Sequence, residues 1–241
     1  MEKFKEFINE FYFRLEILLK EEGFKSNKSK NEISKGTKTD WSKITFDMNK
    51  MYDFTYNVNC AFKVRNNIIR TIYEKIIPEV GRKGDRWFCL LYRPYKLCEC
   101  YYPKITDWET IRDTETKISG KVVDFSNASS VDKWFAGFEE FLNSAGFDFF
   151  DRFKEVDGYD KWLNKPLLEN SKLTEIYVDW DSRPGLISAQ LCENPNYEQV
   201  YEIWKQHFET VKNKKALQEI IDLKNFLDNY SPTELYQMVQ T

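Results

Sequence analysis

The sequence predicts an α+β protein: a mainly antiparallel sheet, at about residues 41–125, packed by an N-terminal amphipathic helix and by a helical C-terminal half. Three observations carry this prediction. They are an apolar stripe of helical period at the N-terminus, a long apolar and polar alternation after residue 41, and a return to helical period from residue 130. No stretch rich in Gly, Ser or Pro separates the strand-rich part from the helical part at 130–241, so we expect one domain over residues 1–241.

The composition narrows the class of protein. The chain has 241 residues, 36 basic against 39 acidic side chains, and 41% hydrophobic residues. Wrapping nucleic acid normally needs a strong excess of Lys and Arg, so the composition disfavours a nucleic-acid partner. No apolar run approaches the roughly 20 residues that cross a bilayer, and the first residues lack the pattern of a signal peptide. We therefore expect a cytoplasmic protein, whose odd number of cysteines fits free thiols.

The first expected element is an amphipathic helix. Its stripe, at steps of three and four, consists of Phe4, Phe7, Ile8, Phe11, Leu15, Leu18 and Leu19. Gly23 is placed to end this helix in a left-handed conformation, with Phe24 folding back onto the last turn, as in a Schellman motif. Residues 25–39 are polar apart from Ile33, and they predict a solvated loop.

A long strand with one buried face follows from the alternating run. Its apolar positions are Tyr52, Phe54, Tyr56, Val58, Cys60, Phe62 and Val64. The preceding stretch has the same parity, so a hairpin is expected. The apolar residues of both strands must face the same side of the sheet, which requires a loop with an odd number of residues. A three-residue turn at 49–51 would pair Phe46 with Phe54.

The rest of the predicted sheet lies before residue 130. Residues 87–92 are apolar at every position, which is typical of a strand buried on both faces near the centre of a sheet. Residues 97–102 predict its hairpin partner, and residues 117–125 a weaker strand.

Two helices have clear end signals. Asn66 or Asn67 caps a helix that stops before Pro78. A second aromatic stripe begins near Trp134, and Gly146 is expected to end it as Gly23 ends the first helix.

The remaining helical segments are short or separately capped. They are helical turns from 147 to Pro166, a helix over 184–192, a helix capped by Asn196 with Gln199, a helix over 217–230, and one that begins with a Ser231 and Glu234 capping box. Residues 173–180 fit either a strand or a helix.

No catalytic set stands out. His207 is the only histidine and has no recognisable partner, so a structural role is favoured over catalysis. Cys98 and Cys100, with Cys89 nearby, lack the further ligands of a zinc site, so buried thiols are favoured over a metal. Glycine-rich phosphate loops do not occur in the sequence. The sequence therefore predicts no metal and no other cofactor.

A nuclease-like set is one alternative. Asp107, Glu115 and Lys117 resemble the metal-binding acids and the lysine of restriction-endonuclease-like folds. Such triplets are frequent in a chain that is 31% charged, and charges that blunt an edge strand are the favoured interpretation.

A binding cleft is the second alternative. Asp179, Asp181 and Arg183 lie beside turn residues and could line a cleft or hold a cation. A helix start in which Asp181 or Ser182 satisfies free amides is favoured instead.

Charge is uneven along the chain. Residues 25–50 carry seven Lys against three acids, and residues 131–160 carry eight acids against three basic residues. The basic segment, next to Trp41, could contact nucleic acid by stacking, although a solvated loop is favoured. The acidic segment fits a basic partner, because complementary charge selects partners.

The order of an amphipathic helix, the Gly23-Phe24 stop, a polar loop and an alternating strand led by Trp41 resembles uncharacterised bacterial proteins of the domain-of-unknown-function 4304 type. The Trp134 helix and the segment 147–162 are similar to that family's helical end, so the resemblance covers about residues 1–165. It implies a bacterial α+β protein and no particular catalytic residue. Some related families are immunity or defence-associated proteins, which suggests a binding role by analogy alone.

The leading hypothesis is a cytoplasmic protein that binds another macromolecule, as an immunity or defence component, rather than an enzyme. The lack of a catalytic set, the split charge and the 17% aromatic content favour it, because Tyr and Trp are enriched at interfaces. A metal-dependent nuclease and a small-ligand-binding module are the alternatives. The expected partner is a protein, and no oligomeric state is predicted.

Overall fold

The computed structural model describes most of the chain, and the described part divides into two compact units. The described residues are 2–76, 90–92, 121–169 and 181–240. The sheet unit comprises residues 1–63 and 91–150, and the helical unit comprises residues 64–90 and 151–241. That the chain forms a single domain stays a prediction.

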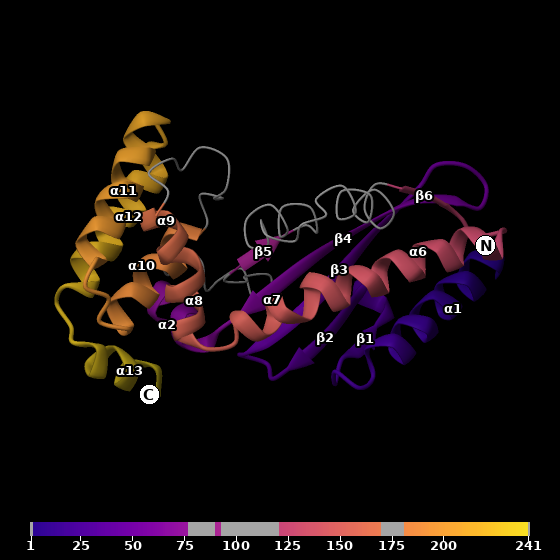
Figure 1. Cartoon of the computed structure of the whole chain (residues 1–241), viewed down its shortest axis with the longest axis horizontal. Helices are drawn as coiled ribbons and strands as arrows, with labels where there is room; N and C mark the ends of the chain where they lie inside the picture. The colour runs from indigo at the N-terminus through magenta and orange to yellow at the C-terminus, as the bar shows by residue number, and fades with distance from the viewer. Residues whose placement is uncertain (1, 77–89, 93–120, 170–180, 241) are drawn as a thin grey trace. The chain divides into compact units, whose positions relative to one another are not determined.

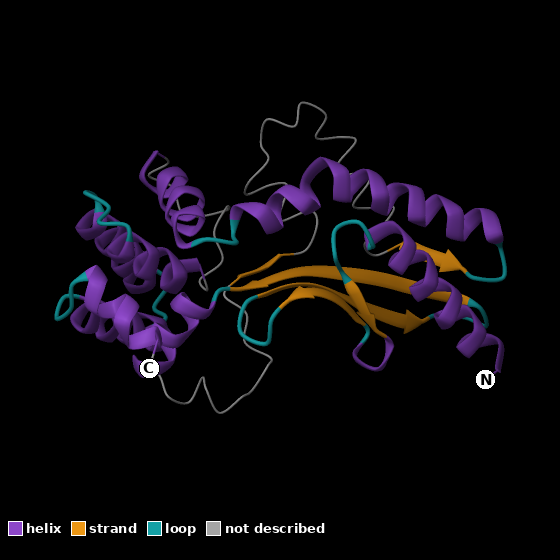
Figure 2. Cartoon of the chain, turned by 90° about the horizontal axis from the view of Figure 1, so that it is seen from below, coloured by secondary structure: helices purple, strands orange, loops and turns teal. Residues whose placement is uncertain are grey.

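The sheet unit combines one curled antiparallel sheet with two long helical segments (Figure 2). The strands follow the order β1-β2-β3-β4-β5, and β6 also pairs with β4. The elements that lie wholly or mostly in this unit are α1 (Glu2–Leu19), β1 (Lys25–Asn27), η1 (Lys28–Lys30), β2 (Glu32–Gly36), β3 (Trp41–Lys50), β4 (Thr55–Arg65), β5 (Leu90–Tyr92), β6 (Lys121–Asp124), α6 (Ala128–Phe141), η3 (Leu142–Gly146) and α7 (Phe147–Arg152). This confirms the predicted α+β class.

Helices α1 and α6 lie side by side on one face of the sheet (Figure 1). Their shared contact is Phe46 of β3, whose ring centroid lies 5.5 Å from that of Phe11 on α1 and 5.9 Å from that of Phe138 on α6. Phe11 also contacts Trp134 of α6 at 5.2 Å. The two aromatic stripes of the sequence therefore pack on each other and on the same sheet face.

The predicted end of α1 is confirmed in detail. Gly23 has φ +76° and its amide donates to the Lys20 carbonyl at 3.0 Å, while the Phe24 amide donates to the Leu19 carbonyl at 3.3 Å. These are the two hydrogen bonds of a Schellman motif. Phe24 is buried, and its ring lies 5.4 Å from that of Phe150.

The predicted loop at 25–39 is wrong. Strands β1 and β2 occupy most of it, and β2 pairs with β3 so that Ile33 faces Ile44. Both isoleucines are buried. A short strand near a sheet edge needs few apolar residues because most of its side chains stay in solvent, and the single Ile33 is enough here.

The predicted hairpin is confirmed, but its turn lies later than expected. Every second residue from Tyr56 to Val64 is buried, as the alternation predicts. The chain turns between Tyr52 and Thr55, and the amides of Met51 and Tyr52 both donate to the Thr55 carbonyl, which is the pattern of a β-bulge. Phe54 is therefore a turn residue and 40% exposed, rather than an inward strand residue opposite Phe46.

The predicted stop at Gly146 is also wrong. Helix α6 continues through the π-helical segment η3 into α7 without a left-handed residue. A Cβ on Gly146 would lie 3.0 Å from both Phe62 Cε1 and Leu142 Cδ2. This glycine permits close packing rather than ending a helix.

The helical unit is built around α10. Its elements are α2 (Asn67–Ile76), α8 (Val156–Tyr159), η4 (Asp160–Asn164), α9 (Lys165–Glu169), α10 (Ser182–Leu191), α11 (Tyr197–Thr210), α12 (Lys214–Leu227) and α13 (Pro232–Gln240). Residues 182–189 are all buried, and α10 contacts α2, α11, α12 and α13.

The helix caps predicted for this unit are confirmed only in part. The Asn66 side chain caps α2 by accepting from the Ile68 and Ile69 amides, and the Ser231 and Glu234 capping box is present. Asn196 occupies the N-cap position of α11, as expected, but its side chain makes no capping hydrogen bond.

Pro166 does not end its helix either. The helix runs on through α9 to Glu169. The π-helical turn η4 ends at Asn164, two residues before Pro166, and its wider spacing relieves the clash that a proline ring makes with the preceding turn.

Two other predicted elements are only partly described. Of the strand predicted at 87–92 the structure describes β5, which comes last in the strand order rather than near its centre. Of the strand predicted at 117–125 it describes β6. Residues 97–102 and 173–180 lie outside the described residues.

Candidate functional site

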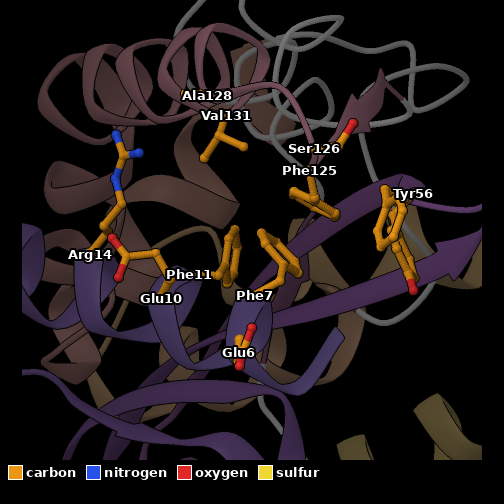
Figure 3. Close-up of a pocket in the computed structure, with 11 residues that line it drawn as sticks. Glu6, Phe7, Glu10, Phe11, Arg14, Tyr56, Phe125, Ser126, Ala128 and Val131 are labelled. Carbon is orange, nitrogen blue, oxygen red and sulfur yellow. The ribbon is translucent and has the colours of Figure 1, made fainter. Parts of the chain in front are cut away.

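The sheet unit contains a cavity of about 760 Å³ between α1, the β3–β4 turn, the first residues of β4 and the segment that joins β6 to α6. We call it the α1–α6 cavity. Its lining residues are Glu6, Phe7, Glu10, Phe11, Arg14, Phe54, Tyr56, Phe125, Ser126, Ala128 and Val131. It lies within the sheet unit, on the face that α1 and α6 cover (Figure 3).

Aromatic rings from separate segments meet in this cavity. Phe7 and Phe11 are four residues apart and so share one face of α1, and Tyr56 is the first inward residue of β4. The Phe125 ring stacks on Phe7 at a centroid distance of 3.3 Å and lies 5.3 Å from Tyr56 (Figure 3). The tilted pair of Phe125 and Tyr56 lies within the range of separations that aromatic rings favour.

The rings form a buried floor and an open rim. Phe11 and Tyr56 are buried, whereas Phe54 is 40% exposed and Phe7 and Phe125 are half-buried. Burial raises the pKa of the Tyr56 hydroxyl, so this group stays protonated near neutral pH and can donate a hydrogen bond. Because these rings come from different sides, an apolar side chain that enters the cavity would contact several of them.

Backbone hydrogen bonds position the rim. The Phe125 amide donates to the Phe54 carbonyl at 2.9 Å, which ties the β3–β4 turn to the segment before α6. In that segment Asp124 Oδ1 accepts from the Ser126 amide at 2.9 Å, and the Asn127 side chain caps α6 by accepting from the Ser129 amide at 3.0 Å. The open rings are thus held by an ordered turn and a capped helix.

The charged residues of the cavity are arranged unevenly. Arg14 pairs with Asp132 of α6 at 2.8 Å, and its guanidinium lies 4.2 Å from the centre of the Phe135 ring. Glu6 and Glu10 are exposed, and neither forms an ion pair with any residue that the structure describes. The cavity therefore has two available carboxylates and a cation that is already engaged.

More apolar surface lies beside the cavity at the β3–β4 turn. Tyr52 is 71% exposed and Met51 is 48% exposed. Together with Phe54 they place three large apolar side chains on one exposed turn. Exposed apolar residues gathered in one place mark interaction sites more often than scattered ones do.

The predicted cleft residues lie elsewhere, in the helical unit. Asp181 and Arg183 are buried, and Arg183 Nη2 lies 2.6 Å from Glu219 Oε2 of α12. The Tyr73 hydroxyl of α2 approaches the same carboxylate at 3.5 Å. Helix α10 starts at Ser182 with Asp181 at its N-cap position, which confirms the expected helix start, but the Asp181 side chain makes no capping hydrogen bond. Neither residue lines the α1–α6 cavity, and because Asp179 lies outside the described residues their cleft stays a prediction.

A second polar group surrounds Asp160 of the same unit. Its carboxylate accepts from Asn164 Nδ2 at 2.7 Å and from Asn194 Nδ2 at 2.9 Å. Burial first, and then the charges of Asp160 and Asp157, raise the pKa of the Cys192 thiol to about 11. This thiol is therefore almost entirely protonated near neutral pH, which makes it a poor nucleophile.

Of the other candidate residues, the structure describes only His207. Asp107, Glu115 and Lys117, and likewise Cys89, Cys98 and Cys100, lie outside the described residues. His207 packs against both Trp204 and Phe208 of α11. Within the described ranges no group of three or more His, Cys, Asp or Glu residues is placed to hold a metal ion.

Trp41 does not serve the stacking role considered for the basic segment. It is 7% exposed, and the Lys43 ammonium lies 4.5 Å from the centre of its ring. A base could not reach the ring face without displacing this contact.

Comparisons of the chain with protein-family models, with curated proteins and with solved structures find no match. The resemblance to the domain-of-unknown-function 4304 type stays a prediction, and no residue role comes from a relative. Among the described residues no helix is both long enough and apolar enough to cross a membrane.

Sequence reasoning assigned the cavity rings to the core and missed the cavity itself. A signal was present: Glu6 and Glu10 flank Phe7 and Phe11 at the same four-residue spacing on α1. Carboxylates beside an aromatic stripe indicate that part of the stripe lies at the surface.

Proposed function

We propose that the protein acts by binding a partner protein through the α1–α6 cavity and the adjoining β3–β4 turn. The observation that carries this proposal is an aromatic cavity of about 760 Å³ that opens beside three exposed apolar side chains. Binding surfaces typically have an apolar, aromatic-rich centre within a polar rim, and the few residues that dominate affinity are often rings in pockets.

A bacterial source, a cytoplasmic location and an immunity or defence role are finer parts of the proposal. They rest on the sequence pattern and on analogy. The small-ligand alternative is supported by the same cavity, since ligand pockets commonly have about 300–1,000 Å³. The exposed turn favours a protein partner, because Met51 and Tyr52 do not line the cavity and would be left uncovered by a small molecule.

Two exposed phenylalanines give a matched test. Phe54 lines the cavity and is 40% exposed, whereas Phe13 on α1 is 55% exposed and does not line it. Proteins that co-purify with the full chain from its source cells would be quantified for wild type, Phe54→Ser and Phe13→Ser. We expect a partner that wild type and Phe13→Ser retain and that Phe54→Ser loses by about tenfold or more, which corresponds to roughly 1.4 kcal/mol.

Recovery of the wild-type protein without any partner would contradict the proposal. So would equal retention of the partner by both variants. Thermal unfolding of all three proteins checks that the substitutions leave the fold intact, which is expected because both side chains are exposed.

A further inference from the structure

The side of the cavity formed by α1 is negatively charged. Glu6 and Glu10 are one helical turn apart, so both carboxylates lie along the same edge of the cavity. Arg14 is one turn further along the same face, but Asp132 and the Phe135 ring already engage its guanidinium. It offers little positive charge to a ligand.

The amino end of α6 is the main opposing influence. A helix contributes about half a positive charge at its first turn, and the Asn127 side chain already satisfies the Ser129 amide there. Two full negative charges on α1 outweigh this partial charge. The field at the cavity entrance therefore favours a cation and disfavours phosphate or carboxylate.

The aromatic rings of the cavity also favour a cationic ligand. A Lys or Arg side chain can lay its methylene groups on the apolar floor of Phe11 and Tyr56 while its cation stays near the rim. A cation within about 6 Å of a ring centre is also attracted to the ring face. Half-buried Phe7 and Phe125 present such rings next to Glu6 and Glu10.

We propose that the α1–α6 cavity binds a basic peptide segment of a partner protein, in which a Lys or Arg lies beside a large apolar residue. This inference rests on the proposed function and adds the chemistry of the partner. The apolar residue packs against Phe54 and against the stacked pair of Phe7 and Phe125, the cation is held by Glu6 and Glu10, and the rest of the segment covers Met51 and Tyr52.

The test is a selection of random dodecapeptides displayed on phage, with the full-length protein as target. The parallel targets are Glu6→Gln/Glu10→Gln, Phe125→Ala, and the control Glu139→Gln/Glu140→Gln, which removes two exposed carboxylates from α6 outside the cavity. Thermal unfolding midpoints identify any target that is not folded. Selected peptides are then synthesised and their affinities are measured by fluorescence anisotropy at low and high salt.

We expect the wild type and the control to select peptides in which Lys or Arg accompanies Trp, Phe, Leu or Met. An exposed ion pair typically changes affinity by about two- to fivefold. Glu6→Gln/Glu10→Gln should therefore weaken these peptides by about fivefold or more, and salt should weaken them on wild type. Phe125→Ala should weaken binding of every selected peptide, whatever its charge.

Two outcomes separate the inference from the proposed function. Apolar peptides that need Phe125 but show no preference for Lys or Arg would overturn the cationic partner and leave the cavity as the binding site. Selected peptides that bind Phe125→Ala as well as wild type, or a selection that yields no peptide, would overturn both.

Discussion

The two units treat charged side chains in opposite ways. In the helical unit Arg183 is buried with Glu219 as its partner, and Lys224 is buried between Glu198 and Asp228 at 2.9 and 2.6 Å. In the sheet unit Glu6 and Glu10 are exposed beside open rings and have no ionic partner in the described part of the chain. Buried charges must be paired because an unpaired charge in the interior costs several kcal/mol, whereas exposed carboxylates beside rings remain available to a ligand. The helical unit thus contains buried ion pairs, whereas two carboxylates of the sheet unit stay exposed at the rim of its cavity.

The largest expected effect is the loss of the buried pair. Arg183→Met removes the nearest cation from Glu219, which keeps only the exposed Lys215 at 3.9 Å and the Tyr73 hydroxyl at 3.5 Å, and should lower the free energy of unfolding by about 3–5 kcal/mol. Chemical denaturation monitored by circular dichroism measures this loss of stability.

A double variant separates pairing from packing. Arg183→Met/Glu219→Leu should recover most of the stability, since an apolar pair of similar volume can replace a buried ion pair. Lys165→Ala, which breaks a pair whose side chains are 68% and 62% exposed, should change stability by less than about 1 kcal/mol. Similar losses for Arg183→Met and Lys165→Ala would contradict the view that the buried ion pairs of the helical unit contribute more to its stability than the exposed ones do.

The next effect concerns thiol reactivity in the helical unit. With a pKa of about 11 instead of 9, Cys192 should have about 100-fold less thiolate at pH 8 than an ordinary thiol. Iodoacetamide labelling followed by peptide mass spectrometry should show slow modification in the folded protein, rising through pH 10–11, and fast modification in urea. Asp160→Asn should speed the folded reaction only in part, because burial is the larger cause. Equal rates for folded and unfolded protein would contradict this account.

A smaller effect tests how tightly the sheet unit is packed away from its cavity. Gly146→Ala inserts a methyl group against Phe62 and Leu142 and should cost about 1–3 kcal/mol. At Gly23 nothing lies within 4 Å of an added Cβ and φ is +76°, so Gly23→Ala should cost about 1 kcal/mol through backbone strain alone.

Asparagine distinguishes the two causes. It tolerates a left-handed backbone, so Gly23→Asn should be milder than Gly23→Ala, whereas Gly146→Asn should be worse than Gly146→Ala. Denaturant unfolding of the four variants gives the comparison. The same rank order at both positions would mean that Gly146 is a backbone requirement after all.

The sequence predicted those features that depend on neighbouring residues. The stripe of α1, its Schellman end at Gly23, the inward parity of β4 from Tyr56 onward and the capping box at Ser231 are set within a few residues. Gly146 shows the limit of such signals. A glycine followed by phenylalanine occurs at both Gly23 and Gly146, and only a contact with Phe62, far away in the sequence, distinguishes close packing from a cap.

The cavity was beyond prediction for the same reason. Phe7, Tyr56 and Phe125 come from three distant segments, and their spacing indicates burial without showing what covers them. Arg183 and Glu219 are 36 residues apart, so the residue spacing within a helix could not predict this pair. The exposed Phe54 follows from the position of the turn, and a bulge shifts parity in a way that alternation alone does not reveal.

The most direct test of the cavity as the binding surface is hydrogen exchange of the full chain with and without a saturating peptide from the selection. The account predicts slower exchange in α1, in the β3–β4 turn and in residues 125–131, with the helical unit unchanged. Protection confined to the helical unit, or protection of the sheet unit that persists in Phe125→Ala, would contradict it.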